Sequence, residues 1–380
     1  TIGAGSATAG YALDVRGAAY VSTITAPIDL VDQGPYLLPS AANSSIITSW
    51  INKVTNTVTA NSSVSSFWSA PTASTFGTVT TTSGANPYHG GVLLPDGRVM
   101  MCPWGQNQIG LFNPANNTWA AGPVVAFYMG GGALLPSGSV LLFPTNSPYN
   151  TYLFNPITNT VSAGPTATTT NAFRGGVLLP DGRVLMVPAG TGNVGFFTTS
   201  GTFAAGPAVT GSYSGAVLLP NGSAVLVPQG ATMARVFDGT TLSAGASATG
   251  HSGGVLLPDG RVLLVPETAA NIRIFDPAGN SGAGSIFVGP LATGYFGGVL
   301  LPNGNVLMAP SSAANIGIYN PVTNTFTSGP ACGASYGAVL LPDGRVVVCP
   351  VGTSSPPIGL YLSNTPAPVE FCLHPYFNKF

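Results

Sequence analysis

One phrase recurs along most of the chain and limits the folds open to it. From residue 93 onward the string Leu-Leu-Pro occurs seven times, with its proline at 95, 136, 180, 220, 258, 302 and 342. The successive spacings are 41, 44, 40, 38, 44 and 40 residues, and a second proline follows eight residues after each first one. Self-similarity at such a period is the signature of a repeat architecture. We therefore interpret the chain as an array of seven similar units.

Each unit contains the pattern of four short β-strands. Two apolar runs flank a turn dipeptide, which is Asp-Gly at 96–97, 181–182, 259–260 and 343–344, Asn-Gly at 221–222 and 303–304, and Ser-Gly at 137–138. These dipeptides tolerate positive φ and close tight hairpins. Because both runs are nearly all apolar, we expect their strands to be buried on both faces, with the prolines at strand ends. Four antiparallel strands in about 40 residues predict an all-β fold, a seven-bladed β-propeller.

The ends of the array indicate how the ring closes. The seventh unit supplies three strands, at 337–341, 345–349 and 358–362, and then departs from the pattern. Upstream, the phrase at 67–71 resembles the fourth-strand phrase at 118–123. We predict a propeller over 64–380 that is closed by an N-terminal strand near 64–72, after an irregular stem or attachment segment over 1–63. An open ring would leave exposed sheet edges. Phrases at 39–43 and 54–57 echo those at 310–315 and 322–325, so a degenerate partial blade, and with it an eight-bladed ring, is the alternative.

Two resemblances follow from these motifs. The Gly-Gly at the first strand, the hairpin and the aromatic end of the third strand resemble kelch-type propeller repeats over residues 64–363. Residues 11–22, with Ile2-Gly3-Ala4-Gly5 before them, are similar to a stem phrase of tail-fibre and virion-surface proteins of phages and large DNA viruses. Together they imply a kelch-like propeller of a virion fibre, tail or capsid, which attaches through its N-terminal part.

The scarcity of charge excludes several functions. Asp, Glu, Lys and Arg make up 6% of the chain, against about 25% in an ordinary soluble protein. The net charge is −1 and there are two lysines, which argues against nucleic acid as a partner because such binding depends on Lys and Arg contacts to phosphate. No apolar run is long enough to predict a membrane span. Four cysteines are too few and too scattered for a disulfide scaffold, although a Cys332–Cys372 bridge stays open.

The same scarcity argues against an enzyme. Four of the eleven acids and four of the ten bases belong to the predicted hairpins. A glycosidase needs two facing carboxylates, and Glu267 alone lies in a suitable loop of the ring. A copper site of the galactose-oxidase kind needs two histidines, a tyrosine and a cysteine, but His89 and His251 fall in roughly opposite blades. We predict no catalytic residue, no metal and no cofactor.

Binding candidates come from positions that vary between repeats. The first strand of each blade lines the channel of a propeller, so the residues entering it form the mouth. These two positions and the adjoining loops are rich in aromatic and hydrogen-bonding side chains, which suit a neutral sugar. The alternative is that the aromatic rings only plug the channel and pack between the blades. The candidates are Tyr88, His89, Trp104, Phe173, Arg174, Tyr213, His251, Tyr295, Phe296 and Tyr336.

Three functional hypotheses result. The first is a structural virion protein that presents a propeller for assembly or host-receptor contact at the virion surface or outside the cell. Its partners would be other virion proteins, further copies of itself and a host glycan. The second is a secreted or cell-surface lectin-like module. The third is a polysaccharide hydrolase or lyase that uses Glu267 or Arg174.

Overall fold

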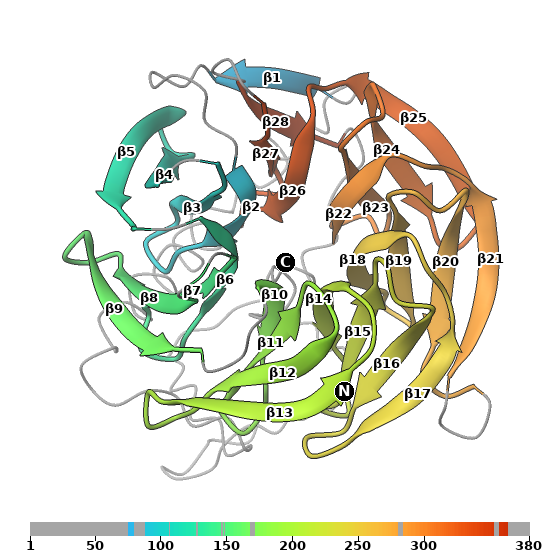
Figure 1. Ribbon diagram of the computed structural model, residues 1–380. Coiled ribbons are helices and arrows are strands. Elements are labelled where there is room, and N and C mark those ends of the chain that lie inside the picture. Colours follow the sequence, from blue (N-terminus) through green and yellow to red (C-terminus); the bar gives the residue numbers. More distant parts are fainter. Residues whose placement is uncertain are drawn as a thin grey trace, which may run out of the picture.

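Six repeat units each fold into one four-stranded antiparallel sheet, the seventh unit adds an N-terminal strand to its own three, and the seven sheets stand around a common axis (Figure 1). The computed structural model describes residues 75–79, 88–105, 107–126, 128–145, 147, 149–167, 172–279, 284–352 and 357–363. The seven-bladed propeller expected from the repeat is confirmed. The expected attachment segment over 1–63 lies outside the described residues, as does Cys372 of the considered disulfide.

The two inner strands of each blade are the apolar runs that flank the turn dipeptide. The innermost strands are β2 (Tyr88–Leu93), β6 (Met129–Leu134), β10 (Phe173–Leu178), β14 (Tyr213–Leu218), β18 (His251–Leu256), β22 (Tyr295–Leu300) and β26 (Ser335–Leu340). The second strands are β3 (Val99–Pro103), β7 (Val140–Pro144), β11 (Val184–Pro188), β15 (Ala224–Pro228), β19 (Val262–Pro266), β23 (Val306–Pro310) and β27 (Val346–Pro350). Every residue of the second strands is buried, as the unbroken apolar runs predict.

The two outer strands complete each blade. The third strands are β4 (Gln108–Asn113), β8 (Asn150–Asn155), β12 (Gly192–Phe197), β16 (Met233–Phe237), β20 (Asn271–Asp276), β24 (Asn315–Asn320) and β28 (Ile358–Leu362). The outermost strands are β5 (Thr118–Val124), β9 (Thr160–Thr166), β13 (Phe203–Val209), β17 (Leu242–Ser247), β21 (Ser285–Leu291), β25 (Thr325–Ala331) and β1 (Thr75–Val79). The hydrophobic core lies between the blades, because each of the apolar clusters joins side chains of two neighbouring sheets.

The strand that closes the ring is β1, which pairs antiparallel with β28 of the last blade (Figure 1). This strand spans Thr75–Val79, on the N-terminal side of the array. The closing strand predicted near 64–72 lies outside the described residues. Phe76 stands opposite Tyr361, the register in which Trp119 stands opposite Phe112 in the first blade. A Cβ atom added to Gly359 would lie 2.7 Å from the Phe76 ring, so this glycine makes room for the ring. Thr75-Phe76 therefore repeats the Thr118-Trp119 pair of the outer strands.

The hairpin charges also join blades to one another. Arg98, Arg183, Arg261 and Arg345 each pair with the aspartate two residues before, at 2.6–2.7 Å. Three of them reach a neighbouring blade as well: Arg98 donates to the backbone oxygen of Pro156, Arg183 to that of Gly239, and Arg345 to that of Pro114. The last of these contacts crosses the seam between the seventh and first blades. The structural role expected for the hairpin charges thus includes blade-to-blade contacts.

Candidate functional site

A β-bulge opens each inner strand and decides which side chains reach the channel. The register of the pairing between β2 and β3 shifts by one residue between Tyr88 and Gly91, and a similar slip in register lies at the start of the other six inner strands. A bulge leaves an unpaired residue and re-aims its side chain. His89 lies inside the slip of β2 and lines the cavity at the ring's centre, and Arg174 does the same in β10. In six of the seven inner strands the second residue lines this cavity, whereas Ser252 of β18 is buried and bonds to Glu267.

The first residue of each inner strand points between the blades instead. Tyr88, Phe173 and Tyr213 have no exposed surface, His251 is 1% exposed and Tyr295 is 5% exposed. In β2 the reason is a glycine on the third strand, because a Cβ atom at position 110 would lie 2.8 Å from the Tyr88 ring. The expectation that both positions line the channel is corrected by this packing. Five of the ten candidates are core residues, and the cavity is lined by His89, Arg174, Phe296 and Tyr336.

Three blades contribute an aromatic cluster to one side of the channel, formed by His89, Trp104, Phe296 and Tyr336. The centroid of the His89 ring lies 4.9 Å from that of Trp104, 5.0 Å from that of Phe296 and 5.5 Å from that of Tyr336. Phe296 and Tyr336 are 4.7 Å apart by the same measure. Two of these contacts are edge-on and two are tilted, at centroid distances within the range that favours aromatic pairs. The sequence positions of these four candidates are far apart, and the ring brings them together.

The opposite blades contribute a polar chain, formed by Arg174, Gln229, Glu267 and Ser252. Arg174 donates from Nη1 to Oε1 of Gln229, and Gln229 donates from Nε2 to Oε2 of Glu267 at 2.7 Å. Ser252 donates from its hydroxyl to the same oxygen of Glu267. The chain links three blades and fixes the side-chain amide of Gln229 in one orientation. An arginine and a carboxylate are thus joined through an amide rather than by direct contact.

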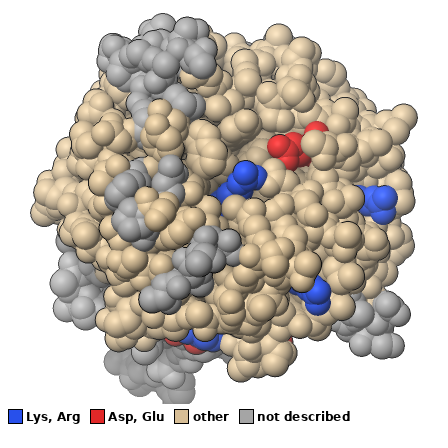
Figure 2. Space-filling view, in the orientation of Figure 1, with Lys and Arg blue, Asp and Glu red and all other residues tan. Residues whose placement is uncertain are grey.

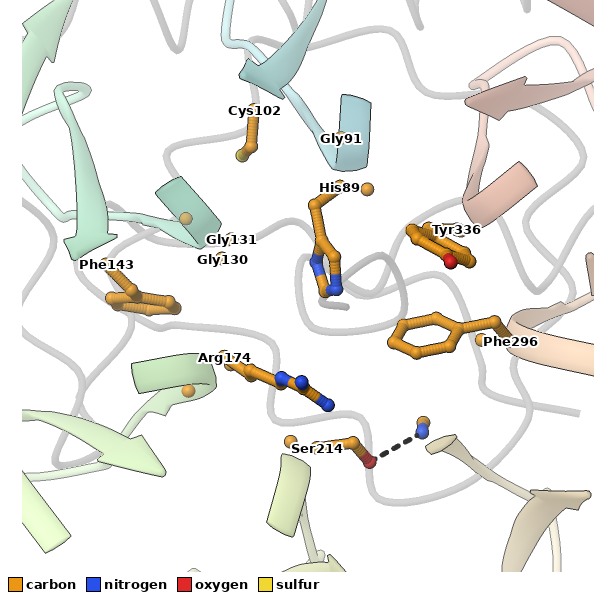
Figure 3. A pocket seen from close by; sticks show the side chains of 18 of the residues that line it. His89, Gly91, Cys102, Gly130, Gly131, Phe143, Arg174, Ser214, Phe296 and Tyr336 are labelled. Carbon is orange, nitrogen blue, oxygen red and sulfur yellow. Dashed lines mark hydrogen bonds between the residues drawn. The ribbon is translucent and has the colours of Figure 1, made fainter. Parts of the chain in front are cut away.

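His89, Phe296 and Tyr336 of the aromatic cluster and Arg174 of the polar chain border one central cavity, which residues of all seven inner strands line (Figure 3). Glycines form most of its wall, and their lack of side chains lets neighbouring strands approach. A Cβ atom at Gly175 would lie 2.8 Å from the backbone oxygen of Ser214, and one at Gly253 would lie 2.7 Å from Cα of Gly297. The Ser214 hydroxyl accepts a hydrogen bond from the Gly253 amide at 3.0 Å. The glycine pairs of the repeat are therefore close-approach positions around the channel.

Burial controls the charge of the cavity. The pKa of His89 falls from 6.5 to about 4, first because burial penalises the imidazolium and second because Arg174 is positive. His89 is therefore neutral at pH 7. Burial also raises the pKa of the Cys102 thiol, which stays protonated. The face drawn in Figure 2 carries few charged side chains in its described part, and the hairpin ion pairs lie at the other ends of the inner strands.

Gln229 is a functional candidate that the sequence pattern alone did not single out. It follows the second proline of its repeat, as Trp104 and Glu267 do in theirs. That shared offset is the signal that could have found it, because Trp104 is itself a candidate. The asparagines that begin two third strands have a structural role, since the side-chain amides of Asn271 and Asn315 donate to outer-strand backbone oxygens, at 3.1 and 2.8 Å.

Comparison with known proteins establishes the fold. Virginiamycin B lyase from Staphylococcus aureus, in a catalytically inactive form with quinupristin, is similar at a TM-score of 0.65 and 14% identity, over 76% of this chain and 99% of that one. A streptogramin B lyase structure matches at a TM-score of 0.64 and 14% identity, over 77% of this chain and 99% of that one. A fungal alcohol oxidase of the AA5 family in complex with copper matches at a TM-score of 0.61 and 14% identity, over 77% of this chain and 76% of that one. No protein-family model and no curated protein matches the chain.

At 14% identity these similarities show a shared propeller fold and establish no activity for this chain. The kelch and virion resemblances stay predictions, since none of these proteins bears on them. Among the described residues, no three His, Cys, Asp or Glu side chains gather closely enough to hold a metal ion. The described part also contains no helix with the length and apolar character needed to cross a membrane.

Proposed function

We propose that this propeller is a non-catalytic binding module whose central cavity takes a carbohydrate. The observation that carries the proposal is that the rings of His89, Phe296 and Tyr336 border one cavity together with Arg174, which Gln229 and Glu267 hold from behind. Ligand sites typically combine apolar and aromatic walls with a few fixed polar groups. Here the polar groups are fixed by hydrogen bonds to one another, so they are oriented before any ligand arrives.

The aromatic cluster supports a sugar in particular. A pyranose ring presents one face of C–H groups, which packs on an aromatic ring, and a rim of hydroxyls. Phe296 and Tyr336 lie side by side and supply the apolar surface, while His89 is neutral and offers a ring nitrogen without the cost of burying a charge. Gln229 and Glu267 are partly exposed and supply donors and acceptors for a rim of hydroxyls, whereas the buried Ser252 holds Oε2 of Glu267 in place.

A glycan array tests the proposal. The intact chain should give a reproducible set of signals, and Tyr336→Ala should weaken them about fivefold, since loss of one stacking partner costs about 1 kcal/mol. The matched control is Phe287→Ala, which removes an aromatic ring that is 50% exposed on the outermost strand β21. Thermal unfolding of both variants checks that they are folded. An array without signals from the folded wild-type chain would reject the proposal.

The small number of carboxylates near the cavity supports a module that does not cleave its ligand. In the described part of the chain, Glu267 is the carboxylate at this end of the inner strands, and its Oε2 accepts two hydrogen bonds. Hydrolysis of a glycosidic bond by the usual route needs a second carboxylate opposite the first. Incubation with array-positive oligosaccharides should therefore leave their chain length unchanged. Shortened products that disappear with Glu267→Gln would assign a hydrolase or lyase instead.

The place where the module works is a separate proposal. We infer a virion surface from the similarity of residues 2–5 and 11–22 to virion stem phrases, which lie outside the described residues. A chain with little charge to keep free copies apart suits a role inside a larger assembly. Mass spectrometry of purified particles should find the chain at fixed stoichiometry. Particles that lack it would favour the secreted lectin-like alternative.

A further inference from the structure

The Arg174 guanidinium is the unusual group of the central cavity. It extends from β10 toward the middle of the space bordered by His89, Ser214 and Phe296 (Figure 3). Glycines surround its backbone, and the wall beyond it is aromatic. Of the described residues that line the cavity, Arg174 alone carries a charge at neutral pH, since His89 is neutral and Cys102 is protonated.

This guanidinium lacks the carboxylate partner that the four hairpin arginines have. Arg98, Arg183, Arg261 and Arg345 each hold an aspartate at 2.6–2.7 Å, whereas no described carboxylate forms an ion pair with Arg174. Its one hydrogen bond within the described residues uses Nη1 and ends on the neutral amide oxygen of Gln229. Glu267 lies one step further along the polar chain, where it accepts from Gln229 and Ser252.

The remaining donors of Arg174 suit a particular anion. A guanidinium presents its N–H groups as a planar fork that matches the two oxygens of a carboxylate. A phosphate monoester carries nearly two charges, and the described cavity wall offers it no second cation. Gln229 holds one arm of the fork in place, so the other arm keeps a fixed direction. One positive charge and one oriented fork match one carboxylate.

We propose that the cavity binds an acidic carbohydrate, with the carboxylate of a uronic acid unit on Arg174 and its ring stacked on Phe296 and Tyr336. This inference rests on the proposed function and narrows its ligand class. It replaces the neutral sugar expected from the sequence, because the pattern of aromatic side chains could not show that Arg174 is left without a carboxylate. His89 and Trp104 extend the stacking surface to a neighbouring unit of the same chain.

Paired probes that differ only at the carboxyl group test the inference. One is an oligogalacturonate and the other is the same oligomer with its carboxyls reduced to hydroxymethyl groups, and calorimetry measures both affinities. The wild-type chain should bind the uronate at least about tenfold more tightly, as expected for a charge-assisted bidentate contact. Added salt should weaken the uronate complex and leave the reduced probe unaffected.

The variants separate the two claims. Arg174→Gln should abolish the preference between the probes, and Arg174→Lys should keep part of it because the charge remains without the fork. Arg261→Gln, in the hairpin at the other end of its blade, is the matched control and should keep the full preference. Equal affinity of the wild-type chain for both probes would overturn the acidic ligand and leave the carbohydrate site standing. Failure to bind either probe would also overturn it, and the glycan array would then decide the fate of the proposed function.

Discussion

Arg345 provides the sharpest test of how the ring holds together. Its guanidinium donates from Nη2 to the backbone oxygen of Pro114 at 2.7 Å and from Nη1 to Oδ1 of Asn117 at 3.0 Å, across the seam between the last and first blades. Arg261 has the same ion pair with its hairpin aspartate, and within the described residues it makes no hydrogen bond to another blade. Arg345→Ala and Arg261→Ala therefore differ in the two bonds that cross the seam.

The size of this difference follows from the contacts. A hydrogen bond from a charged donor contributes about 1.5–3 kcal/mol when buried. The Arg345 side chain is 25% exposed, so we take about 1 kcal/mol for each bond and about 2 kcal/mol for both. The ring from Thr75 to Ser363 has about 290 residues, and an unfolding entropy of about 2.1 cal/mol/K per residue gives about 0.6 kcal/mol/K. The extra loss in Tm is then about 3 °C.

Scanning calorimetry of the two variants and the wild type measures this difference. Arg261→Ala loses only a partly exposed ion pair and should unfold within about 1–2 °C of the wild type, because such pairs contribute about 0–1 kcal/mol. Arg345→Ala should unfold about 3 °C below Arg261→Ala. Equal Tm values for the two variants would refute the claim that the seam contacts stabilise the ring.

Two other predictions concern the channel wall and pH. The Tm of Gly175→Ala should lie well below that of Gly215→Ala. A Cβ atom at position 175 would lie 2.8 Å from the backbone of the next strand, whereas no atom lies within 4 Å of a Cβ atom at position 215. Equal Tm values would contradict this close approach. The pKa values of His89 and His251 fall from 6.5 to about 4 through burial, so the unfolded chain binds more protons between these values and stability should drop as pH falls from 6.5 to 4. The slope is up to about 1.4 kcal/mol per pH unit for each histidine, and a double His→Gln chain should lose most of it in denaturant titrations.

The fold could be predicted because every repeat carries the same local signals. The turn glycine, such as Gly97 with φ of 86°, and the proline at each second-strand end mark the boundaries of the two inner strands. The closing strand was harder to place, because the Thr75–Val79 strand lacks the Gly-Pro that ends most other outer strands. Its Thr-Phe pair is the part that the repeat preserves, and Phe76 is the residue that packs.

The site could be predicted only in part, and the bulge is the reason. In a regular strand the first two residues point to opposite faces, which gives no ground for choosing between them. The slip at the start of β2 sends Tyr88 between the blades and His89 into the channel. The pairing of Arg174 with Gln229 rather than with a carboxylate depends on how neighbouring blades are spaced, which no single repeat encodes.

The most direct test of the carbohydrate site is a structure of the chain with an array-positive oligosaccharide. We expect the sugar in the central cavity, with one ring against Phe296 and Tyr336 and its polar edge toward Arg174 and Gln229. A sugar bound elsewhere on the ring, for example along the exposed Phe287 and Val288 of β21, with an empty central cavity, would contradict it.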